Sequence, residues 1–98
     1  MDYYRLIFTQ RALSDLAKIV GDVAKDDSQA ASQFGNALLD HVDLLKRFPR
    51  MGTITPKRPR LRQLVHSPIL IYYQILEDKL SVKLLYFRHG SRKSPNPR

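Results

Sequence analysis

The stretch ILIYYQILEDKLSVKLLYFR, residues 69–88, contains the clearest signal for the fold of this chain. Its first part, Ile69–Leu76, consists almost wholly of β-branched, aromatic and aliphatic residues, a composition typical of β-strands. Its last part, Leu80–Arg88, alternates between one set of side chains that begins at Leu80 and another that begins at Ser81. Because only residues 77–79 separate the two parts, we expect two neighbouring antiparallel strands joined by a short turn.

The segments that precede this stretch extend the predicted sheet. Arg60–His66 is a further extended segment that ends at a Ser-Pro turn, so it adds another antiparallel strand. Tyr3–Phe8 is rich in aromatic and β-branched residues and predicts a first strand. Pro49–Pro59 contains three prolines. Since prolines block both helices and sheet ladders, we expect a loop there.

Two amphipathic helices are predicted between the first strand and this loop. Apolar residues recur at three- and four-residue steps from Gln10 to about Lys25, and again from Ser28 to near Arg47. Thr9 and Ser28 can each cap the start of a helix through the side-chain hydroxyl. The second helix should stop near Arg47, because the residue before the proline at position 49 is pushed out of helical geometry.

These elements predict an α+β fold of order β-α-α-β-β-β, with an N-terminal helical hairpin packed on a mainly antiparallel four-stranded sheet. We expect one domain over residues 1–93 and a flexible tail over residues 94–98. Tyr72 and Tyr73 should point to opposite faces of one strand, so at most one should lie in the core, and we expect that residue to be Tyr73. The other expected core residues are Leu13, Leu16, Val20, Phe34, Leu38, Val42, Leu45, Ile71, Ile75, Val82 and Leu84.

The charge of this protein is unevenly distributed along the chain. The net charge is +8 at neutral pH. Residues 1–45 contain four basic and seven acidic side chains, a net charge of −3, whereas residues 46–98 contain thirteen basic and two acidic ones, a net charge of +11. Such asymmetry creates a local field that attracts polyanions or an acidic partner protein.

The composition also excludes several classes of protein. The sequence contains no cysteine, which excludes a disulfide framework and a thiolate metal site, and its three histidines have no metal-site spacing. Charged residues interrupt every apolar run well short of the ~18 residues that a membrane span needs, and the N-terminus lacks a signal-peptide pattern. We therefore expect a cytoplasmic protein that contacts no membrane and needs no cofactor or metal.

Six short motifs follow one another between about residues 3 and 93. They are Phe8-Thr9 followed by Ala12-Leu13-x-Asp15-Leu16, then Ala30-Ala31-x-x-Phe34, Leu45-x-x-Phe48-Pro49-Arg50-x-Gly52, Leu61-Arg62-x-Leu64, Ile71-x-Tyr73-x-Ile75 and His89-Gly90-x-Arg92. In this order and spacing they resemble the RelE/ParE superfamily of bacterial type II toxins. The resemblance implies a toxin silenced by an antitoxin from the neighbouring gene. We expect this antitoxin to be acidic and to lie across the basic half of the chain.

The third motif also has a structural interpretation. It reads as a helix stop in which Phe48 closes the core and Gly52 permits a positive φ angle.

The resemblance leaves two unrelated activities open. RelE-like toxins cleave mRNA in the ribosomal A site without a metal, whereas ParE-like toxins bind and block DNA gyrase. RelE-like nucleases have an arginine where this chain has Leu70, and their C-terminal arginine and tyrosine fall on Gly90 and near Asn96. These differences favour the gyrase inhibitor over the endoribonuclease. A slip of the alignment by one or two residues would let Arg88 or Arg92 replace the lost arginine.

The candidate site residues are six cations and one histidine. Lys57, Arg58, Arg60, Arg62, Arg88 and Arg92 are candidates for binding the target or a phosphate. His89 is the candidate general base or acid if the chain is a nuclease.

Alternative roles remain open for several of these residues. Arg62 could instead make an ordinary salt bridge, and His89 could fix the end of the chain. His41 falls on the apolar stripe of the second helix, where a core-edge role is expected. His66 has no evident partner. A pure nucleic-acid-binding module is a third functional class, suggested by the basic residues 57–60 but by no recognised motif.

Overall fold

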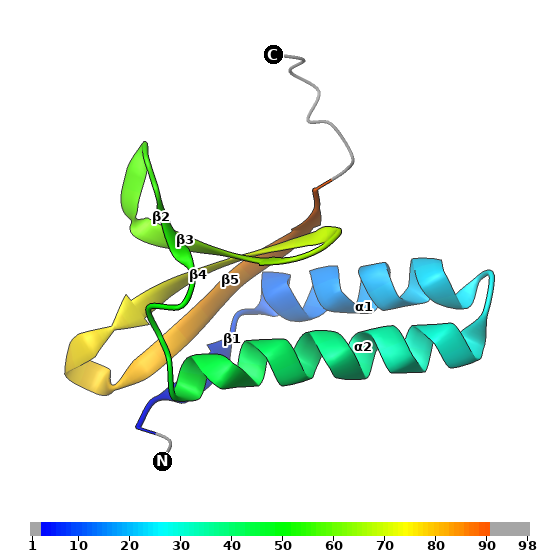
Figure 1. Cartoon of the computed structure of the whole chain (residues 1–98), viewed down its shortest axis with the longest axis horizontal. Coiled ribbons are helices and arrows are strands. Elements are labelled where there is room, and N and C mark those ends of the chain that lie inside the picture. The colour runs from blue at the N-terminus through cyan, green and yellow to red at the C-terminus, as the bar shows by residue number, and fades with distance from the viewer. Residues whose placement is uncertain (1–2, 91–98) are drawn as a thin grey trace.

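The computed structural model describes residues 3–90, which form two helices packed against one five-stranded sheet (Figure 1). The elements are β1 (Arg5–Phe8), α1 (Gln10–Ala24), α2 (Ser28–Asp43), β2 (Thr53–Thr55), β3 (Arg58–His66), β4 (Ile69–Leu76) and β5 (Ser81–His89), with short 3-10 turns at Leu44–Lys46 and Glu77–Lys79. The strands lie in the order β1-β5-β4-β3-β2. β1 runs parallel to β5, and the other neighbouring strands are antiparallel.

The α+β class and the helical hairpin are confirmed, but the predicted four-stranded sheet is wrong in detail. The described residues contain a fifth strand, β2, inside the segment that we expected to be a loop. Its three residues are Thr, Ile and Thr, and the prolines of this segment all lie outside it. β2 can therefore pair with β3, where Thr53 lies opposite Gln63. The predicted tail at 94–98 lies outside the described residues.

The start of each helix is set by a side-chain cap. Thr9 caps α1 as predicted, because its Oγ1 accepts a hydrogen bond from the Ala12 N–H at 3.0 Å. The same hydroxyl donates to the Leu85 carbonyl at 2.8 Å and so ties the helix start to β5. The predicted cap at Ser28 is wrong, because Asp27 is the extended residue and its carboxylate accepts from two N–H groups of the first turn.

The core lies between the helical hairpin and one face of the sheet. The predicted core residues that are fully buried are Leu38, Val42, Leu45, Ile71, Tyr73, Val82 and Leu84. Leu16, Val20, Phe34 and Ile75 are only partly buried. The prediction for Leu13 is wrong, since it is 49% exposed. The neighbouring Ala12 faces the core instead, because a small residue lets the start of α1 approach the sheet closely.

Only Tyr73 of the pair at 72–73 belongs to the core cluster between helices and sheet, as predicted, although both tyrosines are buried. They do point to opposite faces of β4. Tyr73 faces the helices, and its hydroxyl donates to the Pro49 carbonyl at 2.7 Å and accepts from the Gly52 N–H at 2.9 Å. Tyr72 faces the other side, where the ring of Tyr86 covers it. Both faces of β4 are therefore covered at this point, one by the helices and the other by the ring of Tyr86.

The end of the helical hairpin is also stabilised differently from the prediction. Phe48 is 52% exposed and does not close the core. Tyr73 closes it instead, because its hydroxyl is hydrogen-bonded to the backbone of Pro49 and Gly52. Gly52 has no positive φ angle. A Cβ atom there would lie 2.6 Å from the Gln63 carbonyl oxygen, so the glycine is required by a close approach of two backbone segments.

Candidate target-binding surface

The two helices cover one face of the sheet and leave the other face open (Figure 1). Strand register assigns residues to these faces, because successive side chains of a strand alternate. Tyr73 pairs with Leu84 and Ile71 with Phe87, and all four are core residues. The pairs that alternate with these, Tyr72 with Tyr86 and Leu70 with Arg88, therefore lie on the opposite side, which we call the open face.

A layered group of cationic and aromatic side chains lies on the open face and at its β5 edge. We call Arg11, Tyr72, Tyr86 and Arg88 the open-face cluster. The two tyrosine rings stack with centroids 4.7 Å apart and planes at 21°. The guanidinium of Arg11 lies 4.2 Å from the Tyr86 centroid, and that of Arg88 lies 5.9 Å from the Tyr72 centroid. Each such cation–π contact contributes about 0.5–1 kcal/mol at an exposed site.

Leu70 lies in this same region, directly across the ladder from Arg88. The leucine leaves the open face apolar at the point where RelE-like nucleases are expected to have an arginine. Arg88 places one guanidinium beside it, with Nη2 3.4 Å from the Tyr72 hydroxyl. Arg88 and Arg92 were the two candidates to replace the arginine that is missing at position 70. Arg88 lies next to that position, and Arg92 lies outside the described residues.

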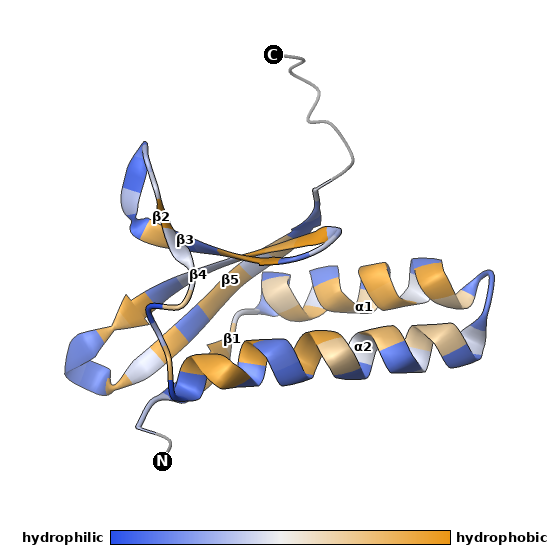
Figure 2. Cartoon of the chain, in the orientation of Figure 1, coloured by the Kyte–Doolittle hydropathy of each residue, from blue (hydrophilic) through white to orange (hydrophobic). Residues whose placement is uncertain are grey.

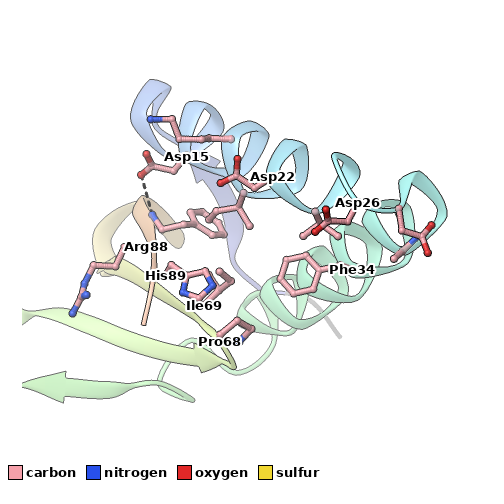
Figure 3. Close-up of a pocket in the computed structure, with 14 residues that line it drawn as sticks. Asp15, Asp22, Asp26, Phe34, Pro68, Ile69, Arg88 and His89 are labelled. Carbon is pink, nitrogen blue, oxygen red and sulfur yellow. Dashed lines mark hydrogen bonds between the residues drawn. The ribbon is translucent and has the colours of Figure 1, made fainter. Parts of the chain in front are cut away.

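His89 belongs to the face of the sheet that the helices cover. It pairs with Ile69, which is fully buried under the helices. In Figure 3, His89 lies beside Ile69 and Pro68, whereas the Arg88 side chain leads away from them. The structure therefore separates the candidate proton carrier from the open-face cluster, because neighbouring residues of one strand project to opposite sides.

The remaining candidate cations lie around β2 and the start of β3. Arg62 is partly buried, and its Nη1 donates to the Gly52 carbonyl at 2.8 Å. Together with Arg50 and Arg60 it lines a small pocket of about 190 Å³. Arg50 is paired with Glu77. The structure thus gives Arg62 a structural contact that the sequence did not predict, since that contact needs the fold to bring Gly52 alongside β3.

Lys57 and Arg58 lie at the tip of the β2–β3 hairpin, and both are exposed. In Figure 2 the ribbon at this tip and at the β4–β5 turn is hydrophilic, whereas long parts of β4 and β5 are hydrophobic. The predicted binding residues therefore divide into an exposed tip, a small pocket beside it and the open face.

A pair of histidines, His41 of α2 and His66 of β3, was missed by the sequence analysis. Their Nδ1 atoms are 2.8 Å apart, so one ring donates a hydrogen bond and the other accepts it. The ring of Phe34 packs edge-on against His66. Burial, followed by the proximity of His41, lowers the pKa of His66 below its ordinary value. Spacing along the chain gives no signal for this contact, which depends on how α2 crosses the sheet.

Residues 3–90 contain no group of three histidine, cysteine or acidic side chains that could hold a metal ion. In the same part of the chain, neither helix is long and apolar enough to cross a membrane.

Comparison with known proteins identifies the family. The sequence model for the ParE toxin of the type II parDE toxin–antitoxin system matches residues 6–94. The chain belongs to the ParE toxin family. The resemblance to the RelE/ParE superfamily is therefore confirmed, and the protein is a toxin of the type II toxin–antitoxin class.

Solved structures share the fold of this ParE-family toxin. A chain of the chromosomal ParDE system from P. aeruginosa superposes with a TM-score of 0.75 at 19% identity, over 89% of this chain and 96% of that one. The isolated E. coli RelE toxin superposes with a TM-score of 0.60 at 22% identity, over 92% and 87%. The RelBE2 complex from Mycobacterium tuberculosis gives 0.59 at 22% identity, over 88% and 96%. None of the curated proteins matches the sequence significantly.

Proposed function

We propose that this ParE-family toxin acts by binding and blocking DNA gyrase, and that it does not cleave RNA. The observation that carries the proposal is the separation of His89 from Arg88. A ribonuclease that activates a 2′-hydroxyl needs its proton carrier and its cations around one phosphate. Here the register turns His89 toward the helix-covered side of the sheet, beside Ile69, and turns Arg88 toward the open face, across from the apolar Leu70, although both residues also line one groove.

A small movement of β5 cannot bring His89 and Arg88 to the same face of the sheet. Bringing His89 to the open face would require its strand to shift by one residue, which would turn the whole apolar set of β5 away from the core. Val82, Leu84 and Phe87 of that set are buried, so the register is strongly fixed. The position of His89 on the side of β5 opposite to Arg88 therefore supports a function in which the protein binds its target and performs no chemistry on it.

The exposed cations suit such a binding role. Lys57 and Arg58 project from the hairpin tip, and Arg88 from the open face, so positive charge is spread over a wide area. Distributed charge of this kind speeds the encounter with an acidic surface, while a few well-packed anchors supply most of the affinity.

Ribosome-dependent mRNA cleavage is the second candidate, and the open-face cluster is the observation that favours it. Stacked tyrosines flanked by arginines can stack on unpaired bases and bind phosphates, as proteins that read single-stranded RNA do. Tyr72 and Tyr86 provide two rings already in parallel contact.

Two assays with the purified toxin separate these functions: gyrase supercoiling and cleavage of mRNA on ribosomes. We expect the wild type to block supercoiling, and we expect His89→Ala to keep most of that activity, because a many-contact surface has no single proton carrier. Gln33→Ala, at an exposed position of α2, is the matched control. Leu70→Arg, tested in both assays, shows whether an arginine on the open face restores cleavage. Codon-dependent cleavage by the wild type, reduced ~10²–10⁴-fold by His89→Ala, would overturn the proposal.

We further propose that the protein works with a cognate antitoxin. The similar RelB–RelE structures from E. coli and M. tuberculosis are toxin–antitoxin complexes. An acidic antitoxin segment laid across the basic half of the chain would combine electrostatic steering with burial of its apolar side chains.

A further inference from the structure

The small pocket of about 190 Å³ between the start of β3 and the end of β4 gathers three arginines, and we call it the arginine pocket. Its charged lining residues are Arg50, Arg60, Arg62 and Glu77, and residues 59 and 74–76 complete the lining. Arg50 follows the helical hairpin, whereas Arg60 and Arg62 belong to β3. The fold therefore brings cations from two segments of the chain to one concave place, where their combined field attracts an anion.

The arginine pocket is separate from the open-face cluster. Arg62 pairs with Tyr73, which belongs to the core under the helices, so Arg62 projects to the side of the sheet opposite to Tyr72. None of the four residues of the open-face cluster lines the pocket. A ligand bound in the pocket would therefore leave the open face accessible.

Arg62 is held in place before any ligand arrives. Its Nη1 donates to the Gly52 carbonyl at 2.8 Å, and the Gly52 N–H donates in turn to the buried Tyr73 hydroxyl at 2.9 Å. A guanidinium has five N–H donors, so the bond to Gly52 leaves most of them available to an anion. Because the side chain is already oriented, less conformational entropy is lost when a ligand binds.

The one acidic residue of the pocket is occupied by other partners. Glu77 accepts from the Tyr4 hydroxyl at 2.8 Å through Oε1 and is paired with Arg50 through Oε2. Within residues 3–90, no carboxylate is paired with Arg60 or Arg62. Three guanidiniums and one carboxylate leave a net charge of 3 − 1 = +2 around the pocket.

We propose that the arginine pocket binds a single phosphate group, either inorganic phosphate or the terminal phosphate of a nucleotide. Such a group carries about −1.5 to −2 charges at neutral pH, which matches the net charge of the pocket better than the single charge of a carboxylate or a phosphodiester. The planar fork of a guanidinium also matches the geometry of phosphate oxygens.

The volume of the pocket sets how much of a ligand it can enclose. Pockets that surround a whole drug-sized molecule measure about 300–1,000 Å³. The arginine pocket is smaller, so it encloses the phosphate group and leaves any nucleoside outside. Binding of a phosphate here goes beyond the choice between gyrase and ribosome and does not depend on it.

An NMR titration of the full-length protein tests the proposal. The titration is run at about pH 8, where phosphate groups carry close to two negative charges. The ionic strength is held at about 0.15 M with sodium chloride, so that screening stays constant. The probes are inorganic phosphate, adenosine 5′-monophosphate, adenosine and acetate. We expect the amide signals of Gly52, Arg60 and Arg62 to shift and saturate with the two phosphates, and to change little with adenosine or acetate.

The two phosphate probes distinguish the sources of the group. Equal affinities would identify the phosphate group alone as the ligand, and a higher affinity for the nucleotide would identify a phosphate ester whose nucleoside contacts the pocket rim. Both outcomes support the pocket. Saturation by acetate at the same concentrations would overturn the proposal in favour of a carboxylate site.

Two substitutions with the same charge change complete the test. Arg60→Gln removes an exposed guanidinium of the pocket and should weaken phosphate binding about tenfold or more, because a charge-assisted hydrogen bond is lost. Arg58→Gln is the matched control, since Arg58 is exposed at the hairpin tip and does not line the pocket, and it should leave the affinity nearly unchanged. The spectra themselves show that each variant is folded. Shifts that never saturate, or equal weakening by both substitutions, would show only diffuse attraction to the basic half and would overturn the proposal.

Discussion

Leu38 and Leu39 show how sharply one helix position differs from the next. Leu38 is fully buried against the sheet, and Leu39 is 40% exposed. We expect Leu38→Ala to lower the free energy of unfolding by roughly 2–5 kcal/mol, because the truncation removes buried methyl groups and leaves a cavity. Leu39→Ala is the control and should cost much less. Urea unfolding of both variants measures the difference. A loss below about 1 kcal/mol for Leu38→Ala would mean that this face of α2 does not form the core.

Gly52 and Gly21 predict opposite responses to the same substitution. A methyl group at Gly52 would meet the Gln63 carbonyl oxygen and the Tyr73 hydroxyl, at 2.6 and 2.8 Å. Gly52→Ala should therefore destabilise the protein by about 1–3 kcal/mol. Gly21 lies inside α1 with nothing within 4 Å of the added atom. Gly21→Ala should stabilise by about 0.4–1 kcal/mol, because alanine restricts the unfolded chain. Thermal unfolding measures both effects, and equal shifts of the two midpoints would contradict this account.

At the scale of elements, the contact between His41 and His66 joins α2 to β3 and makes the stability of the protein depend on pH. The folded state lowers the pKa of His66, so the unfolded chain binds a proton more readily. Stability that depends on neutral His66 is present above its ordinary pKa of about 6.5 and is lost as the pH falls below that value.

The test compares the free energy of unfolding at pH 8 and at pH 5.5, where most carboxylates stay ionised. We expect the wild type to be more stable at pH 8. His66→Asn should reduce the difference between the two pH values, because the group with the lowered pKa is removed. A wild-type stability that is equal at both pH values, or greater at pH 5.5, would contradict a structural role for the neutral histidine pair.

At the scale of the whole molecule, charge is divided between an acidic helical half and a basic half that contains most of the sheet. Association with an acidic antitoxin should therefore slow as salt is raised, because the Debye length falls from about 10 Å at 0.1 M to about 3 Å at 1 M. Stopped-flow mixing measures the rate constant. Lys57→Glu with Arg58→Glu at the hairpin tip should slow association more than Lys18→Glu with Lys25→Glu. Association rates that do not change with salt would exclude electrostatic steering.

The sequence by itself determined both helices, four of the five strands in residues 3–90, and their order. The alternation in residues 69–88, the two apolar stripes and the Thr9 cap are local patterns, and local patterns are sufficient to predict strands, helices and their starts. Motif order was sufficient for the family, which the match over residues 6–94 confirms. The strand β2 was missed because it is only three residues long and lies among prolines.

Only the tertiary structure decided which of the candidate residues meet. The sequence places Arg88 next to His89, yet the strand separates their side chains onto different faces, and the fold places Arg11 over Tyr86 instead. His41 and His66 are 25 positions apart, and their rings touch only because α2 crosses β3. The physical reason is that a strand or helix fixes the direction of each side chain, while the partner in that direction depends on which distant element the fold packs there.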